Sequence, residues 1–101
     1  MRVILLLTLI LAGCASPAPE FFGAQRHDIE LDGIRFAVFR DGTDAEVIRL
    51  GYLSRRARAP VPELMVRAAE QTTGCAVIPG SLRSKIPGDT GEARLSLHCP
   101  P

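Results

Sequence analysis

The dipeptide Asp32-Gly33 separates two stretches of alternating apolar and polar residues, and it constrains the fold more than any other feature. Asp-Gly between two such stretches predicts a β-hairpin with a two-residue loop. Pairing across this loop places five apolar side chains on one face: Ile29, Leu31, Ile34, Phe36 and Val38. On the other face Glu30 falls opposite Arg35, which is a favourable cross-strand pair.

A third strand is predicted after a second turn at residues 40–44. Residues 45–53 again alternate, which extends the hairpin to an antiparallel meander. One face of this strand would carry Ile48, Leu50 and Tyr52, and the other Val47, Arg49 and Gly51.

A helix is predicted to follow a basic loop at residues 54–59. Pro62 suits the first helical position, and Glu63 favours the positive N-terminal end. Gly74 suits the C-terminal cap, so the helix should end near Thr73. One stripe carries its apolar side: Val61, Leu64, Met65, Ala68 and Thr72.

Two further short strands, residues 75–78 and 93–99, are predicted on either side of a long polar loop. The order is β-β-β-α-β-β. We therefore expect a small single α+β domain, an antiparallel sheet with one helix packed on it. The pattern does not give the order of the strands within the sheet.

The N-terminal segment is an apolar run from Val3 to Ala12. At ~1.5 Å per helical residue it covers about half of a ~30 Å hydrocarbon core, so it predicts a signal peptide and not a spanning helix. The run closes on Leu11-Ala12-Gly13-Cys14, an aliphatic residue, two small residues and a cysteine. This motif resembles the lipobox of bacterial lipoproteins.

The resemblance covers about the first fourteen residues. It implies diacylglycerol on the sulfur of Cys14, cleavage before Cys14, and often a third acyl chain on the new amine. Residues 1–13 would be the signal peptide, 14–22 the lipidated cysteine with a Pro- and Ala-rich tether, and 23–101 the domain. In this family a residue other than aspartate after the lipidated cysteine implies sorting to the outer membrane. Ala15 fits that rule, so we expect the domain to be anchored there and to face the periplasm. The alternative is an ordinary secretory signal cleaved nearby, with an incidental cysteine.

The tether is short. About seven residues from Cys14 to Phe21 span at most ~25 Å, so the domain should sit close to the bilayer. We expect Phe21 and Phe22 to cap the domain core, and the alternative is that they enter the lipid interface.

With Cys14 lipidated, Cys75 and Cys99 are left as a disulfide pair in an exported, oxidising compartment. Antiparallel pairing of the last two strands would bring the two cysteines together. A disulfide that closes a loop of about 25 residues stabilises by roughly 3 kcal/mol. A metal or reactive-thiol site is the alternative, although no C-x-x-C or paired histidines favour it.

Charge argues against a nucleic-acid partner. The chain has 12 basic and 11 acidic residues, and loss of Arg2 with the signal peptide leaves 11 of each. A nucleic-acid binder needs a clear basic excess. We also expect no cofactor.

The candidate binding residues are Arg55, Arg56 and Arg58, which precede a helix N-terminus where anions are favoured. They could meet anionic lipid or an acidic envelope protein, and the alternative is a solvated basic loop. Asp41 and Asp44 could suggest a cation site, but the D-G-T-D sequence is more typical of a turn.

The sequence contains no catalytic motif that we recognise. A catalytic site would need a histidine beside a carboxylate, for example His98 with Glu92 or Asp89, whereas alternation points His98 outward and His27 to the core. We therefore predict a membrane-anchored cell-envelope lipoprotein with a small non-catalytic binding or structural module. The alternative is an envelope enzyme, or an inhibitor of one, acting on peptidoglycan or another glycan.

Overall fold

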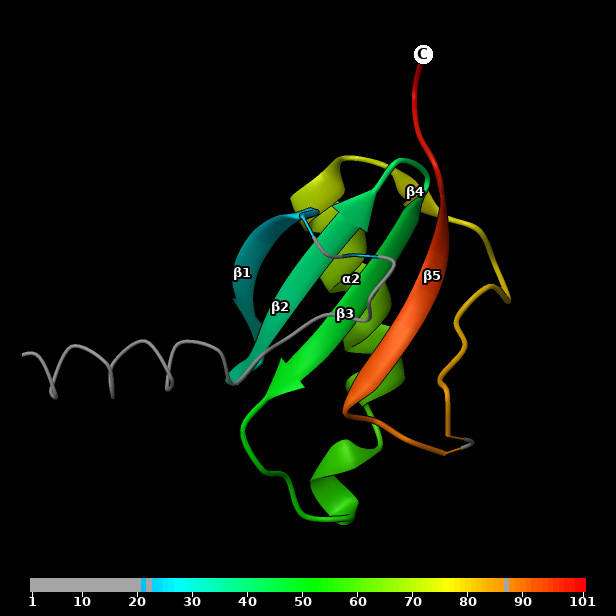
Figure 1. Ribbon diagram of the computed structural model, residues 1–101. Coiled ribbons are helices and arrows are strands. Elements are labelled where there is room, and N and C mark those ends of the chain that lie inside the picture. The colour runs from blue at the N-terminus through cyan, green and yellow to red at the C-terminus, as the bar shows by residue number, and fades with distance from the viewer. Residues whose placement is uncertain (1–20, 22, 87) are drawn as a thin grey trace, which may run out of the picture.

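The structure is a computed structural model that describes residues 21, 23–86 and 88–101. Antiparallel strands form one sheet in the order β1-β2-β3-β5-β4, and a helix packs on one face (Figure 1). The elements are β1 (Gln25–Leu31), β2 (Ile34–Asp41), β3 (Asp44–Leu50), the 3-10 helix η2 (Arg56–Arg58), α2 (Val61–Thr73), β4 (Ala76–Val77) and β5 (Glu92–His98). This is the predicted α+β class, with β5 inserted between β3 and β4.

The β1–β2 hairpin has the predicted register. Asp32 has a φ of 52° and Gly33 a φ of 79°, the positive values that a two-residue hairpin loop requires. The predicted partners are paired: Ile29 with Phe36, Glu30 with Arg35, and Leu31 with Ile34. A local signal of two residues therefore sets the register of the first two strands.

The third strand is shorter than predicted. It stops at Leu50 and not at Leu53, because Gly51 has a φ of 92° and turns the chain out of the sheet. Strands β4 and β5 each differ from the predicted ranges by one residue at either end, and they pair antiparallel as expected.

Helix α2 ends at Thr73 as predicted and begins at Val61, one residue before the predicted first position. Pro62 lies in its first turn, and Gly74, with a φ of 74°, caps its C-terminus by donating its N–H to the carbonyl oxygen of Glu70 at 3.0 Å. Its buried side chains are Val61, Leu64, Met65, Ala68 and Ala69. The buried stripe therefore includes Ala69 in place of the predicted Thr72.

The sheet has an apolar core on each face. The inner face, toward α2, packs the hairpin and the helix together, with Phe36, Val38, Val47, Met65 and Leu95 at its centre. The outer face carries a second cluster of Phe21, Ala37 and Phe39, with Ala24, Ile48 and Leu50 packed against it. Phe21 is only 4% exposed, which confirms that it caps a core, while Phe22 lies outside the described residues.

Candidate functional site

The predicted cysteine pair is joined. Cys75 and Cys99 form a disulfide with a Cα–Cα distance of 4.3 Å, and Arg40 donates from Nη2 to the Cys99 sulfur at 3.3 Å. Cys75 is buried, so the bond belongs to the domain core beside β4 and β5. Cys14, the predicted lipidation site, lies outside the described residues.

The three predicted anion-binding arginines lie in the loop of residues 51–60 but do not act alike. Arg58 is half-buried, donates from Nε to the carbonyl oxygen of Leu53 at 2.9 Å, and holds its guanidinium 5.7 Å from the centre of the Tyr52 ring. Arg55 and Arg56 are exposed. Arg58 therefore shapes the loop, and the other two arginines are available to a ligand.

A second loop, residues 84–86 and 88–91, leaves the same end of the sheet. Arg49 on β3 donates its backbone N–H to Gly91 at 2.9 Å, and its Nη1 reaches the Thr90 hydroxyl at 2.8 Å. The loop presents exposed Lys85 and Ile86. We call the two loops together the loop end.

The opposite end of the sheet carries the β2–β3 turn. Asp41 and Asp44 are both exposed there, and Gly42 between them has a φ of 61°. Within residues 21, 23–86 and 88–101, no three His, Cys, Asp or Glu side chains gather in a way that could hold a metal ion. The structure therefore does not support a cation site at this turn.

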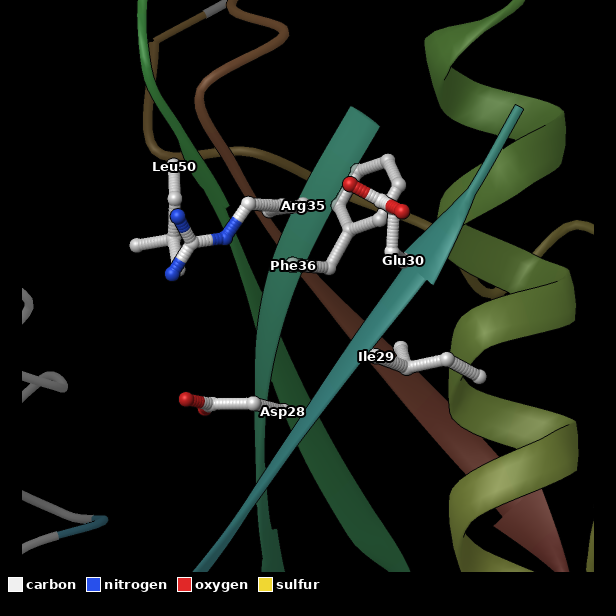
Figure 2. Close-up of a pocket in the computed structure, with 6 residues that line it drawn as sticks. All are labelled: Asp28, Ile29, Glu30, Arg35, Phe36 and Leu50. Atoms are coloured by element: carbon white, nitrogen blue, oxygen red, sulfur yellow. The ribbon is translucent and has the colours of Figure 1, made fainter. Parts of the chain in front are cut away.

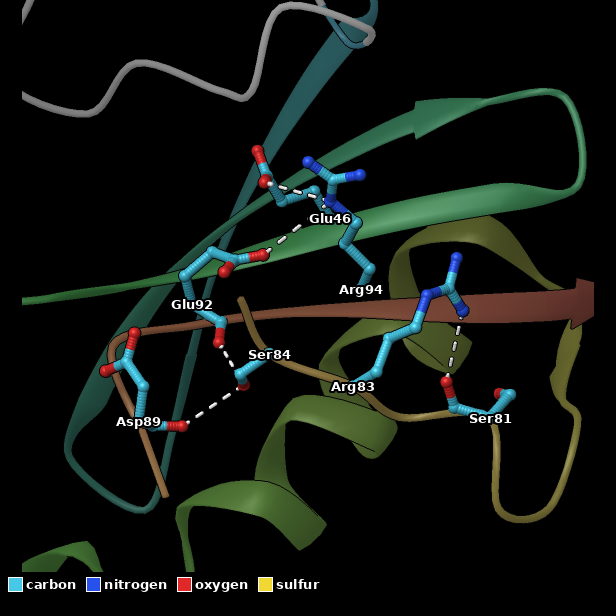
Figure 3. A network of polar contacts seen from close by, with 7 residues as sticks. All are labelled: Glu46, Ser81, Arg83, Ser84, Asp89, Glu92 and Arg94. Atoms are coloured by element: carbon cyan, nitrogen blue, oxygen red, sulfur yellow. Dashed lines mark hydrogen bonds and ion pairs between the residues drawn. The ribbon is translucent and has the colours of Figure 1, made fainter. Parts of the chain in front are cut away.

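On the outer face, two carboxylates share one arginine (Figure 3). The Nε of Arg94 lies 3.8 Å from Glu46 Oε2 and 3.9 Å from Glu92 Oε1. Burial, followed by the charge and hydrogen bond of Glu46, raises the pKa of Glu92 above its ordinary 4.5, against the opposing effects of the Lys85 backbone and Arg94. The Phe21 ring covers this group, with its centre 5.8 Å from the Arg94 guanidinium.

A shallow hollow of about 290 Å³ lies over the first strands. In Figure 2, Arg35 and Leu50 lie on the side away from α2, while Ile29 points toward the helix. The charged side chains of its lining are Asp28, Glu30 and Arg35. Asp28 is paired with Arg26 at 2.8 Å, and Glu30 lies opposite Arg35 on the neighbouring strand, so these charges balance and the hollow indicates no ligand class.

The suggested catalytic pairs do not form. Glu92 begins β5 and His98 ends it, so six residues, or about 20 Å of strand, separate them. Asp89 lies beyond the Glu92 end, where it accepts the backbone N–H of Gly91 at 2.8 Å. Within the described parts of the chain, neither His98 nor His27 makes a side-chain hydrogen bond or ion pair.

No helix in the described part of the chain is long and apolar enough to cross a membrane. No protein-family model, curated protein or solved structure matches this chain. The functional argument therefore depends on the residues themselves.

Proposed function

We propose that this protein is a cell-envelope lipoprotein, held in the outer membrane by acyl chains on Cys14 and facing the periplasm. Its folded part would be a small non-catalytic module for binding or structural support. The observation that carries the proposal is the Cys75–Cys99 disulfide, because such bonds persist in oxidising, exported compartments and are rare in the cytosol.

The start of the folded domain supports the same proposal. Phe21 packs on the outer face of the sheet through Ala37 and Phe39, and Ala24 donates its N–H back to Phe21 at 2.9 Å. The fold is therefore fixed to the chain about seven residues after Cys14, which leaves a tether of at most ~25 Å. Two or three acyl chains are sufficient for stable anchoring.

The experiment is membrane fractionation of the full chain with Cys14→Ser, combined with the intact mass of the extracted wild-type protein. We expect the wild-type protein to have the mass of residues 14–101 plus acyl chains. We expect the variant to carry no acyl mass and to be lost from the membrane fraction. A matched control, Cys75→Ser with Cys99→Ser, removes the two disulfide-bonded sulfur atoms from the domain and should keep the acyl mass.

An unlipidated wild-type mass would contradict the proposal, as would an acyl mass that survives Cys14→Ser. Reduction of the wild-type protein should add the mass of two hydrogens, one for each sulfur of the disulfide. Thiols that react without prior reduction would argue against the exported compartment.

A further inference from the structure

The loop end exposes apolar side chains. Tyr52 is 84% exposed and Ile86 is 67% exposed, one in each loop. Ile78, 44% exposed, is the other large apolar side chain well exposed in the described residues, and it lies beside the C-terminal half of β5. The same two loops carry the exposed basic side chains Arg55, Arg56 and Lys85. Each loop therefore combines a projecting apolar side chain with neighbouring cations.

Cations outnumber carboxylates in the two loops, because residues 51–60 contain three arginines and no acid, and the second loop contains Lys85 and Asp89. At the loop end, the Asp89 carboxylate accepts a backbone N–H at 2.8 Å, and Asp32 lies 3.9 Å from an arginine of α2, while Glu63 is exposed. The opposite end of the sheet exposes Asp41 and Asp44. The domain therefore has a basic, apolar end and an acidic end.

The tether joins the domain within reach of the basic end. Phe21 packs over Arg94, the third residue of β5. Along the strands, Arg94 is about 7 Å from Glu92, where the second loop ends, and its partner Glu46 is about 7 Å from Asp44 at the acidic turn, both well within the tether's ~25 Å. A bilayer that holds Cys14 is thus within reach of the loop end.

We propose that the loop end lies on the anionic lipid surface of the membrane that anchors the chain. Tyr52 and Ile86 enter the headgroup region, and the basic side chains contact lipid phosphates. The acidic turn at Asp41 and Asp44 faces away from the bilayer. This inference rests on the proposed lipid anchor at Cys14 and adds the orientation of the domain and the chemistry of its contact.

A lipid surface fits this end better than an acidic protein. Tyr52 and Ile86 stand on separate loops, and neither lines the hollow over Asp28 and Glu30 on the outer face. A folded partner needs a continuous complementary surface. A bilayer interface accommodates side chains that project separately.

The test uses the emission of Tyr52, because the chain has one tyrosine and no tryptophan. The lipidated protein is reconstituted into phosphatidylglycerol vesicles and into phosphatidylcholine vesicles, each with and without brominated acyl chains. Bromine quenches only fluorophores at the bilayer. We expect brominated phosphatidylglycerol to lower the emission about twofold, and brominated phosphatidylcholine to lower it less.

Two double variants have matched changes in charge. Arg55→Gln with Arg56→Gln should abolish most of the difference between the two lipids while leaving Arg58 to hold the loop. Arg26→Gln with Arg83→Gln removes the same charge outside the loop end and should keep that difference. Circular dichroism of both double variants shows whether the fold is intact.

A lipidated mass without quenching in either lipid would overturn the orientation and leave the proposed function standing. Quenching that is equal in both lipids, or equally sensitive to both double variants, would overturn the headgroup contact. An unlipidated mass would overturn the anchor, and the placement of the loop end with it.

Discussion

At the scale of single residues, the outer face of the sheet shows how a charged position becomes buried. Glu46 alternates with apolar neighbours along β3 and is only 2% exposed. Its cross-strand partner is Arg94, and the Phe21 ring lies over that guanidinium. Charge at these positions is compensated within the sheet, although Glu46 and Glu92 still place two carboxylates around one arginine.

We predict that Glu92→Gln raises the midpoint of thermal unfolding at neutral pH by a few degrees. Burial and Glu46 raise the pKa of Glu92 above 4.5, so the folded chain favours the protonated form. The stabilisation from this group is therefore fully present below pH 4.5 and is lost as the pH rises through the folded-state pKa. A neutral glutamine keeps this stabilisation at all pH values. The thermal midpoints of the wild-type protein and of Glu92→Gln should therefore converge below pH 4.5.

The control for this prediction is Glu63→Gln, which removes the same charge from an exposed position in the first turn of α2. It should give no gain at neutral pH, because a glutamate there favours the helix. A Glu92→Gln protein that is less stable than wild type at neutral pH would show that the ion pair with Arg94 outweighs burial.

At the scale of elements, the loop of residues 51–60 depends on one arginine. We predict that Arg58→Ala lowers the free energy of unfolding by about 1 kcal/mol, since it removes the hydrogen bond to Leu53 and the contact with Tyr52. Arg55→Ala should change it by less than about 0.5 kcal/mol, because that side chain is exposed. Chemical denaturation of the two variants measures the difference, and equal losses would contradict separate roles.

The elements that sequence could predict are those set by nearby residues. Asp32-Gly33 determines the hairpin register, and Gly74 determines the end of α2. The position of β5 between β3 and β4 depends on pairing across more than forty residues, from Val47 to Ala93, and no local pattern encodes it.

The two-sided core was missed for a related reason. Period two shows which side chains share a face but not what will cover that face. Ala37 and Phe39 alternate along β2 with the residues of the inner core, so the pattern assigns them to the opposite face and suggests that this face meets solvent. In the structure Phe21, which lies outside the sheet, covers them.

The candidate site was predicted in part. The disulfide follows from the cysteines and the antiparallel strands, whereas Arg55, Arg56 and Arg58 appeared as one cluster. Only the fold separates them, because Arg58 turns back to Leu53. Exposure of Tyr52 and Ile86 at one end likewise depends on β3 and β5 being neighbours.

At the scale of the whole molecule, the ends of the sheet differ in charge and in apolar exposure. The loop end presents exposed Arg55 and Lys85, and the far end presents exposed Asp41 and Asp44. Such a molecule, tied near the middle of β5 through Phe21, has a preferred orientation in the field of an anionic surface. Apolar insertion and charge should contribute separately to that orientation.

Salt and a serine substitution separate these two contributions. The Debye length falls from about 10 Å at 0.1 M to about 3 Å at 1 M ionic strength, so salt should weaken the contact of Arg55 and Lys85 with the headgroups. Ile86→Ser removes an apolar contact, so it should lower Tyr52 quenching by brominated phosphatidylglycerol at both salt concentrations. Ile78→Ser makes the same change outside the loop end and should leave quenching unaltered. Equal effects of the two serine variants would mean that the loop end does not enter the interface, and quenching unchanged by salt would mean that charge does not hold it there.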